Sequence, residues 1–210
     1  MADSNPALRV VGEWDHPQNV ARDRAGSIHD DEKAKALGFL GAFVSARTHL
    51  NLFAPILRQI YGKDWFEQGV ISMEFRIGTL DREPARAVIE PAGESGSRYA
   101  WLEDGEGREA ARGEVVAGSP NHPTWLGRRD LSRGDDGRPF LRIDHIRPGQ
   151  RFPTVDVTVG DAQVNRYMTS IETPLDWFTG PSPWGGPVAC FGSMVSALGA
   201  PCSAYLRENG

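Results

Sequence analysis

The 210-residue chain has few cysteines, no long apolar run and no surplus of basic side chains. Its two cysteines, Cys190 and Cys202, are too few to staple a domain of this size or to build a zinc site, and they favour a reducing compartment. Nowhere do about 18 apolar residues follow one another, and the N-terminal segment lacks a basic patch followed by an apolar stretch. We therefore expect a cytoplasmic protein without a membrane span or a signal peptide.

A net charge of −5 argues against nucleic acid or anionic lipid as a partner, because such binding depends on clustered Lys and Arg. One local basic group is either a solvated loop or a patch for an anionic cofactor such as coenzyme A; it consists of Arg128, Arg129 and Arg133. The P-loop, the Rossmann glycine fingerprint, the serine nucleophile elbow and the HExxH zinc motif are all missing. Nucleotide hydrolysis, hydride transfer and zinc peptidase chemistry thus have no support, and we predict no cofactor and no metal.

Hydrophobic residues make up 40% of the chain and charged residues 24%, which is typical of a folded globular protein. In the first half, a β-prone run at residues 8–14 precedes a polar loop, a short helix ending at Gly38 and a mostly apolar helix over residues 41–54. Period-two alternation then predicts a strand at residues 71–77. Further β-prone runs follow at residues 85–90, 99–103 and 110–117. We predict an α+β fold in which an antiparallel sheet wraps round a central helix.

The second half restarts this order. Residues 119–139 are rich in Gly, Pro, Asp and Arg and predict a linker. After it we expect strands at residues 140–146 and 151–159 and helices at residues 161–170 and 187–198. No comparable run of strands follows Gly199. The predicted organisation is a first unit, a linker and an incomplete second unit, at residues 1–118, 119–139 and 140–210.

The segment from Ser27 to Phe39 resembles the MaoC-like hydratases and dehydratases, in which a catalytic His is followed by an acid, an Ala and a Gly-Phe pair before the central helix. His29 holds the place of that His. In the family an Asp a few residues ahead completes a catalytic pair; here Arg24 stands in its place and Asp23 lies one residue out of register. The resemblance implies a hotdog fold.

Three stretches of the second half also look MaoC-like, at residues 148–150, 157–161 and 184–188. Where the catalytic segment would lie, this half carries Glu172 and Asp176 but no His. The resemblance therefore implies a double hotdog whose second half is incomplete and inactive.

Hydration of an enoyl thioester needs a base for water, an acid for the α-carbon and N–H donors for the thioester oxygen. The imidazole of His29 suits the first two roles, with Asp23 or Asp31 to orient it. Alternatively, His29 only caps the helix that follows. Small residues and unpaired N–H groups at the expected start of the buried helix are the candidate oxyanion donors: Gly41, Ala42 and Phe43.

Four more residues are candidates for the site. His49 lies inside the apolar helix and either faces the pocket or is a satisfied core residue. Arg47, an unusual charge there, reaches solvent or pairs with an acid or an anionic ligand. Trp177 and Trp184 either form the wall of an acyl or ring-shaped substrate pocket or simply pack in the core.

The leading functional prediction is a hydro-lyase of the hydratase or dehydratase type, acting on an acyl thioester such as an acyl-CoA or on a related carbonyl compound. A hotdog thioesterase is the alternative, with Glu32 or Asp31 activating water. A third hypothesis is a non-catalytic binding subunit completed by a partner chain. Because exposed strand edges commonly pair, we expect a homodimer or a higher homo-oligomer, with a hetero-oligomer left open.

Overall fold

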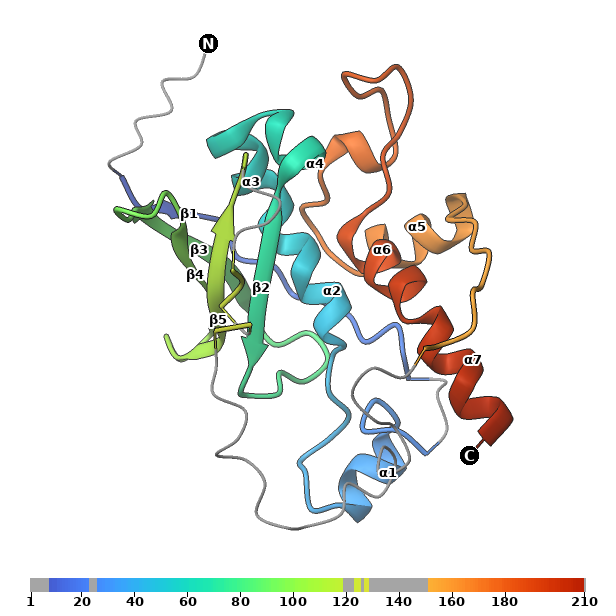
Figure 1. The fold of residues 1–210 in the computed structure, drawn as a ribbon. Coiled ribbons are helices and arrows are strands. Elements are labelled where there is room, and N and C mark those ends of the chain that lie inside the picture. The colour runs from blue at the N-terminus through green and yellow to red at the C-terminus, as the bar shows by residue number, and fades with distance from the viewer. Residues whose placement is uncertain (1–7, 23–25, 119–122, 126, 129–150, 210) are drawn as a thin grey trace.

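The computed structural model of the chain describes residues 8–22, 26–118, 123–125, 127–128 and 151–209 (Figure 1). Its antiparallel sheet has five strands in the order β1-β3-β4-β5-β2. The strands are β1 Val10–Val11, β2 Val70–Phe75, β3 Ala85–Ala92, β4 Arg98–Asp104 and β5 Glu109–Val116. Each predicted run of the first half thus overlaps a strand, and β1 is the shortest of them.

A central helical stretch packs against one face of this sheet (Figure 1). It consists of α2 Ala46–Leu50, the 3-10 turn η1 Asn51–Phe53 and α3 Ala54–Tyr61, which follow one another without a break. The sheet face beneath it is rich in alanine, so that Phe53 and Leu57 are completely buried. The predicted α+β class, with an antiparallel sheet around a central helix as in a hotdog fold, is confirmed.

The start of the central helix was predicted wrongly. The helix begins at Ala46, with Ser45 in extended conformation as its N-cap, rather than at Gly41. The apolar residues ahead of it are extended because they pair with another segment: the Val44 N–H donates to the Thr79 carbonyl at 2.9 Å, and Phe43 forms an isolated bridge with Leu80. A short apolar run fits a buried extended segment as well as a helix.

Two short helices complete the first half. In α1 Asp31–Ala36, as predicted before Gly38, the side chain of Asp30 caps the helix by accepting from the Lys33 N–H. The other, α4 Asp64–Gln68, was not predicted. None of the helices in the described part of the chain has the length and apolar character that a membrane crossing needs.

The C-terminal part adds a layer of helices on the side of α2 that faces away from the sheet (Figure 1). Its elements are α5 Asp161–Met168, the 3-10 turn η3 Asp176–Phe178, α6 Phe191–Leu198 and α7 Ala200–Asn209. The helix predicted at residues 161–170 is confirmed. The second apolar helix begins later than predicted, at Phe191, and α7 was not predicted.

The strand expected at residues 151–159 is absent, and the one expected at residues 140–146 lies outside the described residues. Phe152 and Val157 are exposed rather than turned alternately into a core. Alternation shows which side chains would share a face, but a strand also needs a neighbour for its backbone groups. Here the described sheet is built entirely from the first half.

One buried carboxylate connects the two halves. Asp15 is completely buried, and its Oδ2 accepts from the N–H groups of Glu172 and Thr173 at 2.8 and 2.9 Å and from the Thr173 hydroxyl at 3.0 Å. Its own backbone is paired with Ala85 in β3. The loop before η3 is therefore anchored on the sheet.

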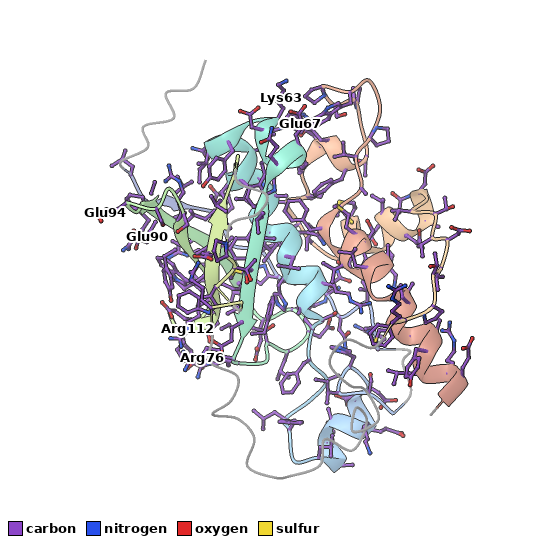
Figure 2. The ribbon with its side chains drawn as sticks, in the orientation of Figure 1. Lys63, Glu67, Arg76, Glu90, Glu94 and Arg112 are labelled. Carbon is purple, nitrogen blue, oxygen red and sulfur yellow. The ribbon has the colours of Figure 1, made fainter. Side chains whose placement is uncertain are left out.

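Charged and aromatic side chains cover the outer face of the sheet. Figure 2 shows Arg76, Glu90 and Arg112 on the side of the molecule away from α6 and α7. Arg86 stacks over Trp14 at 4.3 Å from the ring centre. The apolar core therefore lies on the other face, between the sheet and the helices.

Candidate functional site

The imidazole of His29 is held by the backbone of the segment that leads into α2. Its Nδ1 lies 2.8 Å from the carbonyl oxygen of Phe43. Because a carbonyl only accepts, Nδ1 carries the proton in this contact, and in the neutral ring the lone pair is left on Nε2. The backbone of His29 is fixed too, since its carbonyl accepts from Asn19 Nδ2 at 2.9 Å. His29 is half-buried, with a defined ring orientation.

Two carboxylates were expected to orient His29, those of Asp31 and Asp23. Asp31 is exposed and pairs with the Lys35 ammonium, and it accepts from the Ala42 N–H at 3.2 Å. The hydrogen bond from Lys35, followed by that from Ala42, lowers the pKa of Asp31. The structure therefore brings Asp31 to the segment before α2, whereas Asp23 lies outside the described residues.

The three residues expected to supply oxyanion donors do not lie at a helix N-terminus. The N–H of Ala42 is used by Asp31, and that of Phe43 donates to the Ile28 carbonyl at 3.1 Å. Gly41 and Ala42 do line a hollow of about 470 Å³ together with Asn19 and Asp31. Gly41 and Ala42 thus shape a space next to Asn19 and Asp31, and neither Phe43 nor His29 is among the residues that line it. The N–H groups of Ala42 and Phe43 are already paired.

His49 is a buried residue of the core, and its imidazole is uncharged at neutral pH. Its side chain is 3% exposed, and Nε2 lies 2.7 Å from the Thr79 hydroxyl. Burial lowers the pKa of His49 to about 4, against a smaller opposite effect of the Ser45 carbonyl. A neutral imidazole at this place suits packing better than proton transfer.

Arg47 is half-buried and turns toward α6. One of its Nη atoms donates to the Ser196 hydroxyl at 3.2 Å, and Ser196 in turn lies 2.8 Å from the Tyr167 hydroxyl. Of the alternatives open for Arg47, the structure shows no ion pair with an acid among the described residues. The side chain instead lines a small cavity between α2, α5 and α6.

Trp177 and Trp184 lie in an aromatic cluster against α4, whereas His29 lies next to α1, near the other end of the molecule (Figure 1). The two rings are 6.1 Å apart, and each also lies near Phe66, at 5.2 and 6.2 Å. The structure therefore does not bring the tryptophans together with His29. In the predicted basic group, Arg128 pairs with Glu114 at 2.6 Å, and Arg129 and Arg133 lie outside the described residues.

Sequence reasoning missed the two groups that hold His29 and His49, the Phe43 carbonyl and the Thr79 hydroxyl. Asn19, which lies in the predicted polar loop and holds the His29 carbonyl, was not among the predicted site residues. A cavity of about 940 Å³ between β1, α3 and the loop before η3 was missed as well. Its lining includes Tyr61 and the ion pair of Arg58 with Asp176. Across the described residues, no group of three or more His, Cys, Asp or Glu side chains is arranged to hold a metal ion.

Comparison with known proteins gives distant likenesses. No protein-family model matches the chain, and no curated protein matches it in sequence. Solved structures that are similar to it include the following two. An (R)-hydratase from A. caviae involved in PHA biosynthesis is 17% identical with a TM-score of 0.37, over 51% of this chain and 96% of that one. The ChsH1-ChsH2 complex from Mycobacterium tuberculosis is 16% identical with a TM-score of 0.37, over 52% and 97%.

Proposed function

We propose that the chain is a hydro-lyase of the hydratase/dehydratase type that acts on an acyl thioester or a related carbonyl compound, with His29 as the acid/base. One observation carries the proposal: the Phe43 carbonyl holds the Nδ1 proton of His29, so that Nε2 is the basic atom. In hydration, Nε2 takes a proton from water as its oxygen bonds to the β-carbon, and the imidazolium then returns a proton to the α-carbon. Dehydration is the reverse.

In this proposal the Phe43 carbonyl orients the imidazole, because the MaoC-like motif pairs its His with an Asp where this chain has Arg24. A neutral carbonyl fixes the tautomer, but it stabilises the imidazolium less than a carboxylate does. The hollow lined by Gly41 and Ala42 offers the substrate a place beside the loop. We propose a small-molecule thioester as the substrate and a homo-oligomer as the working form.

The test separates the base at Nε2 from the structural hydrogen bond at Nδ1. In His29→Asn the side-chain amide replaces the Nδ1 donor to Phe43 and removes Nε2, and His29→Ala removes both. We expect each variant to hydrate a panel of enoyl thioesters at least about 100-fold more slowly than the unmodified chain. Enoyl absorbance and free thiol are followed together. His16→Asn is the matched control, since this exposed histidine contacts Glu172 and should leave the rate within about twofold.

Full activity in His29→Asn would overturn the proposal. Release of thiol without loss of the enoyl group would identify a thioesterase and turn attention to Glu32 and Asp31. If the unmodified chain turns over no thioester of the panel, a binding subunit becomes the better reading of the fold.

A further inference from the structure

A small cavity between α2, α5 and α6 is lined by cationic and hydroxyl side chains. Its volume is about 170 Å³, and its polar lining includes Ser45, Arg47, Arg166, Tyr167 and Ser196. About 30 Å³ is the share of one water in the liquid, so the cavity has room for one compact ionic group and a few waters. It is too small for a nucleotide or a whole acyl carrier.

Among the described residues, the charged side chains that line this cavity are all basic. Arg47 and Arg166 both line it, and none of the described residues that line it is acidic. Arg166 donates from Nε and Nη2 to the Val20 carbonyl, which is neutral. Arg47 uses one Nη atom on Ser196. Arg47 is half-buried, and no carboxylate of the described residues pairs with it. Because a guanidinium has five N–H donors, those that Arg47 does not use on Ser196 are available for an oxyanion.

The hydroxyl groups at the cavity form a hydrogen-bond network with Arg47. Ser196 Oγ donates to the Gly192 carbonyl at 2.9 Å, lies 2.8 Å from the Tyr167 hydroxyl and accepts from Arg47. This hydrogen-bond network holds the Arg47 guanidinium at the cavity wall, so that it does not extend into solvent. A charged donor that is already fixed loses less side-chain entropy when a ligand binds.

The cavity shares its walls with the segments that hold His29. Ser45 lines it and follows Phe43 by two residues along an extended segment, which places their Cα atoms roughly 7 Å apart. Ala21 also lines the cavity, and its N–H donates to Oδ1 of Asn19. Nδ2 of the same Asn19 side chain donates to the His29 carbonyl. A group bound by Arg47 therefore lies next to the supports of the imidazole.

We propose that this cavity is an oxyanion site, with Arg47 as its main ligand, that receives a phosphate or carboxylate group carried by the substrate in addition to the reacting thioester. The assignment to the substrate rests on the proposed function, whereas the binding of an oxyanion does not. Phosphate and carboxylate share the chemistry that Arg47 recognises, a compact anion with several acceptor oxygens.

The test is isothermal titration calorimetry of the full chain in a chloride buffer of constant ionic strength, with inorganic phosphate and, separately, with succinate. We expect one site per chain. Arg47→Gln should weaken binding by about tenfold or more, because it removes charge-assisted hydrogen bonds, and Ser196→Ala should weaken it by less. Arg47→Lys keeps the charge, and its affinity should lie between those of the unmodified chain and Arg47→Gln. This variant tests the proposal if Arg47→Gln does not fold. Arg9→Gln is the control, since Arg9 pairs with Glu90 on the far face of the sheet.

Tighter binding of phosphate assigns the site to a phosphoryl group, and tighter binding of succinate assigns it to a terminal carboxylate. Binding of neither probe, or equal binding by Arg47→Gln and the unmodified chain, overturns the proposal. His29→Asn separates the two proposals: it should lose hydration activity and still bind the probe.

Discussion

At the scale of single residues, the buried side chain of His49 makes the free energy of unfolding depend on pH. Its pKa of about 4 in the folded chain lies below the ordinary value of 6.5, because burial disfavours the charged ring. The unfolded chain therefore takes up this proton more readily as the pH falls below 6.5. The contribution of His49 to stability is complete above that pH and is lost as the pH falls toward 4.

We predict that the free energy of unfolding drops by about 2 kcal/mol more between pH 7 and pH 5 in the unmodified chain than in His49→Gln. The Gln amide keeps a polar group opposite Thr79 but does not titrate. Urea unfolding at both pH values measures the difference, and His16→Gln, at an exposed histidine, should behave like the unmodified chain. Equal pH dependence in His49→Gln and the unmodified chain would contradict the assignment.

The predictions that held depend on near neighbours in the sequence: the short helix before Gly38 forms, with Asp31 and Glu32 in its first turn. Its cap, however, is Asp30, so the alternative in which His29 caps this helix was wrong. Partners far along the chain could not be predicted: Thr79 is 30 residues from His49, and Ser196 is 149 residues from Arg47. A hydrophobic pattern carries no information on which hydroxyl or carbonyl the fold brings to a given side chain.

At the scale of elements, α6 packs so closely on α2 that a glycine is required between them. A Cβ added at Gly192 would lie 2.7 Å from the Arg47 carbonyl oxygen and 2.8 Å from the Tyr167 ring. The buried side chain of Asn51 joins the same two helices, since it accepts from the Gly192 N–H at 3.1 Å and donates to the Arg47 carbonyl at 3.2 Å. The position of α6 is thereby fixed against the central helix.

Gly192→Ala should destabilise the protein by about 1–3 kcal/mol, although alanine favours a helix by up to about 1 kcal/mol where there is space. Chemical denaturation measures the change. The control is Gly186→Ala, where an added Cβ meets nothing within 4 Å and the expected change is small. A Gly192→Ala variant as stable as the unmodified chain would show that α6 can move away from α2 at no cost.

The strands of the first half could be predicted because residues 71–77 alternate between apolar and polar side chains and the other runs are rich in β-prone residues. The extended pairing at Phe43 and Val44 could not, since its partners lie in the segment around Thr79 and the run itself is too short to show a period. A different limit led to the wrong strand at residues 151–159, where alternation occurs without a neighbouring strand among the described residues.

At the scale of the whole molecule, one hydrophobic cluster contains residues of both halves. Phe53 and Leu57 from the central helix belong to it together with Val164, Phe178 and Cys190. Aromatic contacts join the halves as well, with Phe66 of α4 at 6.4 Å from Phe178 and 6.1 Å from Phe191. The unit boundaries at residues 118 and 140 remain a prediction, but the core that we describe does not stop at them.

Phe178→Ala should therefore weaken the sheet as well as the C-terminal helices. The loss of this fully buried ring should lower the free energy of unfolding by about 3–5 kcal/mol. Native-state hydrogen exchange would then show reduced protection of the amides in β4 and β5. Phe152→Ala, at a ring that is 38% exposed, is the control. Unchanged protection in β4 and β5 would mean that the halves unfold independently.

The buried contact of Asp15 with Glu172 and Thr173, and that of α2 with α6, join the beginning of the chain to its end. Such pairings have high contact order and form late. During synthesis, roughly 70 residues must follow the first half before α6 emerges, which takes about 4–15 s at ordinary translation rates. For that time the apolar side of α2 and α3 has no cover from its own chain. The nascent chain therefore exposes this apolar side to solvent until residues 191–198 have been synthesised and α6 can fold onto α2.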